Sequence, residues 1–255
     1  YALCIGVSML VALPVAWRGQ RTILQPGPDA PLRELSANLG WLLAGSVLMQ
    51  ALAYSSLLGV NILGTHNDEV IVAGFASAFF IARIPVLAFQ AIQGTLLPKL
   101  AGLAGAGRHD EFRAGLQKLL ALVVTVAVVG TAGAFLLGPI VGKILFKDFT
   151  MGAAGLGLLA AGSGMFIIAL TLAQALMALG GHRMTAISWA VGVVVCGVLM
   201  AVIPGLEARV DIGFLVGSAA TAAVMFVAVA RQRSRMEGLG IAGLVEAIEQ
   251  EPIEI

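Results

Sequence analysis

Charged residues are scarce in this 255-residue chain, because Asp, Glu, Lys and Arg together make up only 11% of it while 59% of the residues are hydrophobic. Soluble domains carry about 25% charged residues. A soluble core cannot use this much apolar surface, whereas a lipid bilayer can. The mean hydropathy of +0.98 points the same way. The shortage of charge excludes an ordinary soluble domain and predicts an all-α, polytopic helical membrane protein.

Residues that hold metals or catalyse reactions are also few. Cys4 and Cys196 lie in apolar runs without CxxC or metal-ligand spacing, so we interpret them as small packed hydrophobes. The sequence contains no HExxH motif, Ser/His/Asp set or acidic pair, and its best polar cluster, HNDE at His66 to Glu69, reads as a turn. A net charge of +1 with scattered cations argues against a nucleic-acid partner. We therefore expect no enzyme and no cofactor.

Seven charge-poor runs are long enough to be membrane spans, because an apolar helix of about 20 residues crosses the hydrocarbon layer. The chain opens with Tyr1 inside the first of them, without the charged region of a signal peptide, and we expect it to be a fragment of a longer protein. The seven predicted spans are residues 1–17, 35–64, 70–100, 119–145, 151–179, 184–203 and 212–230.

The distribution of lysine and arginine over the connections tests this division into spans, because cytoplasmic connections carry an excess of both residues. One side of the membrane would hold Arg18, Arg21, Arg33, Lys99, Arg108, Arg113, Lys118, Arg183, Arg231, Arg233 and Arg235, and the other side Lys143, Lys147 and Arg209. This asymmetry predicts a multi-pass protein of the cytoplasmic (inner) membrane. Its C-terminus would be cytoplasmic, and the turn Thr65 to Glu69 would face outward.

The third run carries Arg83 near its midpoint. A cation at that depth costs about 2.5 to 3.5 kcal/mol on insertion scales, and no Asp or Glu lies within any of the seven runs. Pro85 leaves the carbonyl of Ile81 without its helical donor, which predicts a kink there. Two interpretations stay open. Arg83 either faces a water-filled cavity and binds an anionic group, or it is a structural arginine bonded to helix carbonyls or to an acidic residue outside this chain.

Other polar residues fall on shared helix faces. Gln90 follows Arg83 by seven residues, and Gln50, Tyr54 and Asn61 are spaced by four and seven. Such side chains either hydrogen-bond neighbouring helices or line a hydrated path. We predict that Arg83, Gln90, Gln50, Tyr54 and Asn61 line one substrate cavity.

Glycine is abundant, at 32 residues, and much of it lies inside the predicted spans. Small residues let helix backbones approach closely in a membrane. These glycines either serve helix packing alone or also let helices bend and slide during a transport cycle.

Several motifs follow one another between Glu34 and Arg235. The third run leaves the membrane through LLPKLAGLAGAGRHDEFRAGLQKLL, a Gly-Pro pair and ILF end the fourth, and ALGGHRMTAISW and VIPGL come later. In this order they resemble the C-terminal half of polysaccharide flippases. These belong to the multidrug/oligosaccharidyl-lipid/polysaccharide exporter superfamily, together with multidrug and toxin extrusion transporters and the lipid II flippase.

The resemblance implies a two-lobed transporter with alternating access. Residues 1–17 would be the last helix of the preceding lobe, 18–33 the cytoplasmic linker, 34–230 a six-helix C-terminal lobe and 231–255 a cytoplasmic tail. The partners would be membrane lipids, the absent N-terminal lobe of the same protein, and a lipid-linked sugar diphosphate engaged by Arg83.

The implied activity is flipping of a lipid-linked oligosaccharide for cell-envelope polysaccharide synthesis. Two alternatives stay open: an exporter of drugs or other small molecules from the same superfamily, and a non-transporting membrane scaffold. Relatives often have an acidic residue late in the second span, where this chain has Asn61. Ion coupling is therefore not carried over from the resemblance.

Overall fold

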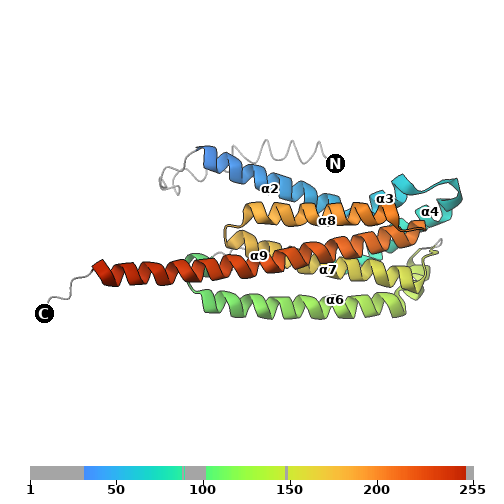
Figure 1. Ribbon diagram of the computed structural model, residues 1–255. Helices are drawn as coiled ribbons and strands as arrows, with labels where there is room; N and C mark the ends of the chain where they lie inside the picture. Colours follow the sequence, from blue (N-terminus) through green and yellow to red (C-terminus); the bar gives the residue numbers. More distant parts are fainter. Residues whose placement is uncertain (1–31, 88, 90–101, 147–148, 251–255) are drawn as a thin grey trace, which may run out of the picture. The chain divides into compact units, whose positions relative to one another are not determined.

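The computed structural model describes residues 32–87, 89, 102–146 and 149–250 (Figure 1). The chain divides into two units, Tyr1–Ala37 and Asn38–Ile255. Most of the first unit lies outside the described residues, as do the predicted first span and most of the predicted linker. The helices that form the core lie in the second unit.

Every regular element of the described part is a helix, which confirms the predicted all-α class. The elements in chain order are α2 (Leu32–Ala53), α3 (Ser55–Leu63), the 3-10 turn η1 (His66–Asp68), α4 (Glu69–Ala82), α6 (His109–Leu145), α7 (Ala153–Ala178), α8 (His182–Val202) and α9 (Leu206–Gln250).

Four of the described helices are long and apolar enough to cross a membrane, and a fifth span results if the bent pair α2 and α3 is one crossing. The chain is thus a multi-pass helical membrane protein. The first predicted run and the end of the third lie outside the described residues, so the total of seven spans stays a prediction.

Helix α7 is the centre of the packing. It packs against α6 on one side and α9 on the other, and α9 also packs against α8 (Figure 1). Glycines permit this closeness, since Gly162 of α7 faces the ring of Phe214 and Gly164 faces Ala127 of α6. Helix α6 instead exposes Leu136 and other large apolar side chains over most of its length. A surface of this kind suits lipid or another apolar partner and not water.

Two boundaries differ from the sequence prediction. Residues 109–118, predicted as the end of a hydrophilic connection, are the first part of α6 and continue into the span without a break. The last span was predicted to begin at Ile212, but α9 begins at Leu206, directly after Gly205 with its φ of +83°. Asp211, which the predicted division left in a connection, therefore lies within a candidate span. Leu206, Val210 and Phe214 are all buried, and burial of this apolar face extends the helix past its charged residues.

A capped turn separates α3 from α4. The Thr65 hydroxyl and backbone N–H donate to the Asp68 carboxylate at 2.7 and 3.0 Å, which lowers the pKa of Asp68. Nearby, His66 Nδ1 lies 3.0 Å from Glu69 Oε1 on the exposed surface. The HNDE cluster therefore caps a helix start, as expected of a turn.

Candidate functional site

Helix α4 breaks at Arg83. The helix ends at Ala82, and Arg83 has φ −97° and ψ −3°. Its N–H donates to the Phe80 carbonyl at 3.2 Å, and the helical path resumes over residues 84–87. Pro85, two residues on, has no N–H to donate, and its ring clashes with the carbonyl four residues earlier in a regular helix. The helix is thus interrupted at the arginine.

A second break lies opposite, between α2 and α3. The two helices meet at Tyr54 with a bend of 57°. Ser55 Oγ donates to the Leu52 carbonyl at 2.8 Å beside the bend. This bend presents the Tyr54 ring toward the arginine.

Three aromatic rings surround the Arg83 guanidinium. Its central carbon lies 4.7 Å from the Phe79 ring centre, 5.1 Å from that of Tyr54 and 5.6 Å from that of Phe166. Cation–π contacts of this kind contribute about 0.5 to 2 kcal/mol each. The rings thus offset much of the cost of placing a cation inside the protein. We call Phe79, Tyr54 and Phe166 the aromatic cage.

The caged arginine is buried, and one of its hydrogen-bond donors has no acceptor in the described part of the chain. The side chain is only 9% exposed, and its Nε has no hydrogen-bond partner in the described part of the chain. Rings interact with the faces of a planar guanidinium and leave its N–H donors directed outward along the edge. A buried donor without an acceptor costs about 1 to 3 kcal/mol. The site therefore favours a ligand that supplies acceptor oxygens.

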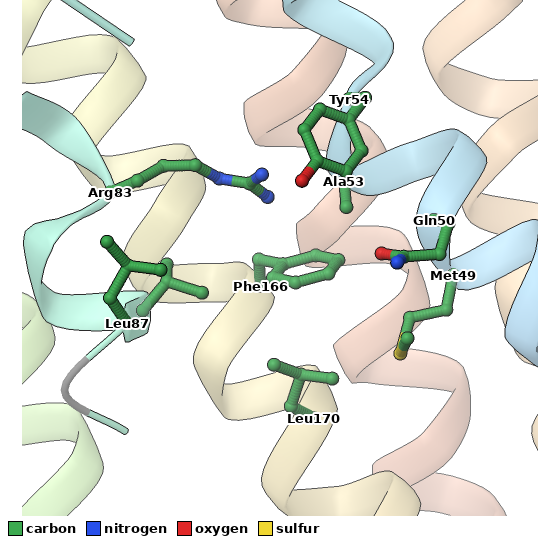
Figure 2. A pocket seen from close by; sticks show the side chains of 9 residues that line it. Met49, Gln50, Ala53, Tyr54, Arg83, Leu87, Phe166 and Leu170 are labelled. Atoms are coloured by element: carbon green, nitrogen blue, oxygen red, sulfur yellow. The ribbon is translucent and has the colours of Figure 1, made fainter. Parts of the chain in front are cut away.

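A cavity of about 180 Å³ opens beside the guanidinium. Figure 2 shows Arg83 and the Gln50 amide reaching into it from different helices, with the Phe166 ring at its wall. It is lined by Met49, Gln50, Ala53, Tyr54, Arg83, Val86, Leu87, Phe166 and Leu170.

Three of the five predicted cavity residues meet here: Arg83, Tyr54 and Gln50. Asn61 does not line this cavity. It is exposed, and its amide donates to the Leu57 carbonyl at 2.7 Å. The 57° bend at Tyr54 lies between Asn61 and Gln50, so helical spacing no longer places them on one face. Gln90 lies outside the described residues.

Pro85 belongs to a different surface. Its ring contacts α6, where Cγ lies 3.3 Å from the position that a Cβ on Gly130 would occupy. It lines an apolar groove with Gly130 and Gly133 and not the arginine cavity. Its effect on the site acts through the backbone.

The sequence did not single out Phe79 and Phe166. Phe79 lies one turn before Arg83, and this spacing is a usable signal because residues four apart share a helix face. Phe166 follows Arg83 by 83 residues, and only the packing of α7 against α4 brings the two together.

No carboxylate balances the arginine in the described residues. The salt bridges there are His66–Glu69 and Arg108–Glu111, both exposed. That part of the chain also holds no group of three or more His, Cys, Asp or Glu side chains placed for a metal. The cavity is thus electropositive.

No protein-family profile matches this chain, and no curated protein does either. A solved structure does match: the crystal structure of MATE in the bent conformation, with a TM-score of 0.66 and 14% sequence identity. The chain has a MATE fold. The match covers 83% of this chain and 49% of the MATE chain, so this chain spans about half the length of that protein. At this identity the likeness concerns the fold alone.

Proposed function

We propose that this chain is the C-terminal half of a membrane transporter that binds the diphosphate of a lipid-linked oligosaccharide at Arg83 and flips it across the membrane. The observation that carries the proposal is the caged guanidinium, buried beside a cavity that has no carboxylate among its described lining residues. The MATE fold supports transport as the activity class.

An anionic group fits the charge and the hydrogen-bond donors of this cavity. The cage stabilises the positive charge without neutralising it, because aromatic rings carry no net charge. Phosphate oxygens accept two parallel hydrogen bonds from one guanidinium, and charge-assisted bonds are about twice as strong as neutral ones. Gln50 adds an amide that donates two further hydrogen bonds. Cationic cargo would be repelled by the same charge.

The two helix breaks supply a means of movement. The Tyr54 bend and the Arg83 break both border the cavity, and hinge motion concentrates at element ends that absorb backbone rotation. In the proposed cycle the substrate diphosphate binds Arg83 from the cytoplasmic side. The two lobes then rock, and the diphosphate is released outward.

The deciding experiment is transport by an Arg83→Gln variant of the intact protein in vesicles, measured with a fluorescent polyprenyl-diphosphate sugar. We expect transport to fall at least about tenfold at normal membrane insertion, because one charged hydrogen-bonding group is worth about 1.5 to 3 kcal/mol. Arg83→Lys should retain part of the activity, since it keeps the charge but loses the bidentate geometry. The matched control is Arg108→Gln, which removes an exposed cation. Unchanged transport by Arg83→Gln would contradict the proposal.

The second candidate is an exporter of small molecules, which the MATE fold supports equally well. The same vesicles distinguish the two when loaded with a cationic dye. Dye transport that survives or rises in Arg83→Gln, together with no movement of the diphosphate lipid in the unmodified protein, would favour the exporter. Movement of neither would favour the scaffold.

A further inference from the structure

Asp211 is a buried carboxylate that the proposed function does not use. It lies in the second turn of α9, its exposed fraction is 0%, and neither carboxylate oxygen has a hydrogen-bond partner in the described residues. In that part of the chain, Arg83 and Asp211 are the only buried residues with an acidic or basic side chain. Buried carboxylates normally have partners, so this one calls for a ligand.

The surroundings of Asp211 are tightly packed. Val210, the preceding residue, fills the space beside Gly59 of α3, with its Cγ1 3.0 Å from where a Cβ on that glycine would lie. Phe214, one turn on, packs on Gly162 of α7. Helix α9 is thus held between α3 and α7 at this level, and ionisation of Asp211 would place a charge inside the junction.

The helices packed against α9 offer little compensating charge. Helices α3 and α7 contain no ionisable residue. Helix α8 contributes the Cys196 thiol, and its His182 and Arg183 lie at its far end.

On α9 itself, Glu207 lies one turn before Asp211, and Arg209 donates from Nε to the Gly205 carbonyl at 3.3 Å. The remaining ionisable groups toward the α9 start are His66, Asp68 and Glu69 of the α3–α4 turn and the exposed Lys143 of α6, while Lys147 and Asp148 lie outside the described residues.

The chemistry of the site selects among ligands. An ionised, unpaired carboxylate is far more costly to bury than a neutral acid. A hard metal ion such as Ca²⁺ takes about 6 to 8 oxygen ligands. No group of three or more His, Cys, Asp or Glu side chains placed for a metal ion occurs among the described residues. A proton needs only one carboxylate oxygen.

We propose that Asp211 is a proton-binding site, separate from the Arg83 cavity, and that its bound proton keeps α9 closed against α3 and α7. Glu207 connects the site to the end of the helix. It is half-buried, and its carboxylate contacts Gly155 at the start of α7. On release, the proton leaves an Asp211 oxygen for the Glu207 carboxylate and then for water, which leaves Asp211 ionised. The new charge draws water into the junction and loosens it.

The direct test is labelling of the intact protein with a hydrophobic carbodiimide, which reacts with protonated carboxyl groups, followed by peptide mass spectrometry. We expect labelling of Asp211 at mildly acidic pH, falling about tenfold for each pH unit above the point of ionisation. Glu207→Gln should keep the Asp211 label. Absence of label on Asp211, labelling that does not change with pH, or protection by sodium ions would overturn the proposal.

A second measurement follows the junction itself, by hydrogen exchange of the α9 backbone amides around Asp211. In the unmodified protein, exchange should accelerate at least severalfold as the pH rises, beyond the intrinsic base-catalysed change measured on an unfolded peptide of the same sequence. Asp211→Asn, which has the shape of the neutral acid, should remove this excess. An equal excess in Asp211→Asn would overturn the proposal, and so would its absence from the unmodified protein.

Discussion

The surroundings of the buried arginine differ from those of the buried aspartate. Three rings lie close to the Arg83 guanidinium, whereas neither Asp211 oxygen has a hydrogen-bond partner in the described chain. A cation gains from the negative faces of aromatic rings, but a carboxylate does not. The arginine can therefore keep its charge inside the protein, while the aspartate is more easily held as the neutral acid.

Tyr54 is the part of the cage that can be removed with the least damage, because its side chain is 43% exposed while Phe166 is buried. We expect Tyr54→Leu to lower the free energy of unfolding by about 0.5 to 1 kcal/mol through loss of one cation–π contact. Tyr54→Phe keeps a ring and serves as the control. Unfolding in detergent by a chemical denaturant measures both.

A double-mutant cycle isolates this contact. In an Arg83→Gln background, Tyr54→Leu should cost almost nothing further, since the cation it contacts is gone. If the effects of the two substitutions simply add, Tyr54 does not stabilise the guanidinium.

At the scale of helices, α8 and α9 touch through their backbones. A Cβ on Gly192 would lie 2.8 Å from the carbonyl oxygen of Gly217, and one on Gly217 would lie 2.7 Å from that of Gly192. Side chains can rotate out of such a contact, but a backbone in a packed helix cannot. This pair fixes the spacing of the two helices.

Gly192→Ala should therefore lower the free energy of unfolding by about 1 to 3 kcal/mol, the usual cost of overpacking. Gly197→Ala on the same helix is the matched control, because a Cβ there meets nothing within 4 Å. That control should be neutral or stabilising by up to about 1 kcal/mol, since alanine favours the helix. Thermal unfolding of both variants in the same detergent makes the comparison. Equal stabilities would show that the α8–α9 contact does not fix the spacing of the two helices.

At the scale of the whole molecule, the distribution of lysine and arginine predicts an orientation that cysteine labelling can test. His66 has a fully exposed side chain in the α3–α4 turn, and Ser234 is exposed on the part of α9 beyond the span. With Cys4 and Cys196 replaced by Ala, we expect a membrane-impermeant maleimide to label His66→Cys in intact cells. Ser234→Cys should react only after permeabilisation. The reverse pattern would mean that the cation excess does not mark the cytoplasmic side.

The sequence by itself determined the class of protein and part of the site. Hydropathy gave the helical membrane class, because lipid solvates apolar side chains whichever helix they face. Proline chemistry at Pro85 indicated where the helix at Arg83 would be interrupted. Spacing along one helix gave Gln50 and Tyr54, since residues four apart share a face.

Tertiary structure decided the rest. The 57° bend at Tyr54 moved Asn61 away from the cavity, and the packing of α7 brought Phe166 to the guanidinium. Only the position of α9 between α3 and α7 turned Asp211, which resembled part of a connection, into a buried carboxylate. Propensity and hydropathy depend on neighbours along the chain. A cage or a buried acid depends on which helix faces which, and that is set by shape complementarity between residues far apart in sequence.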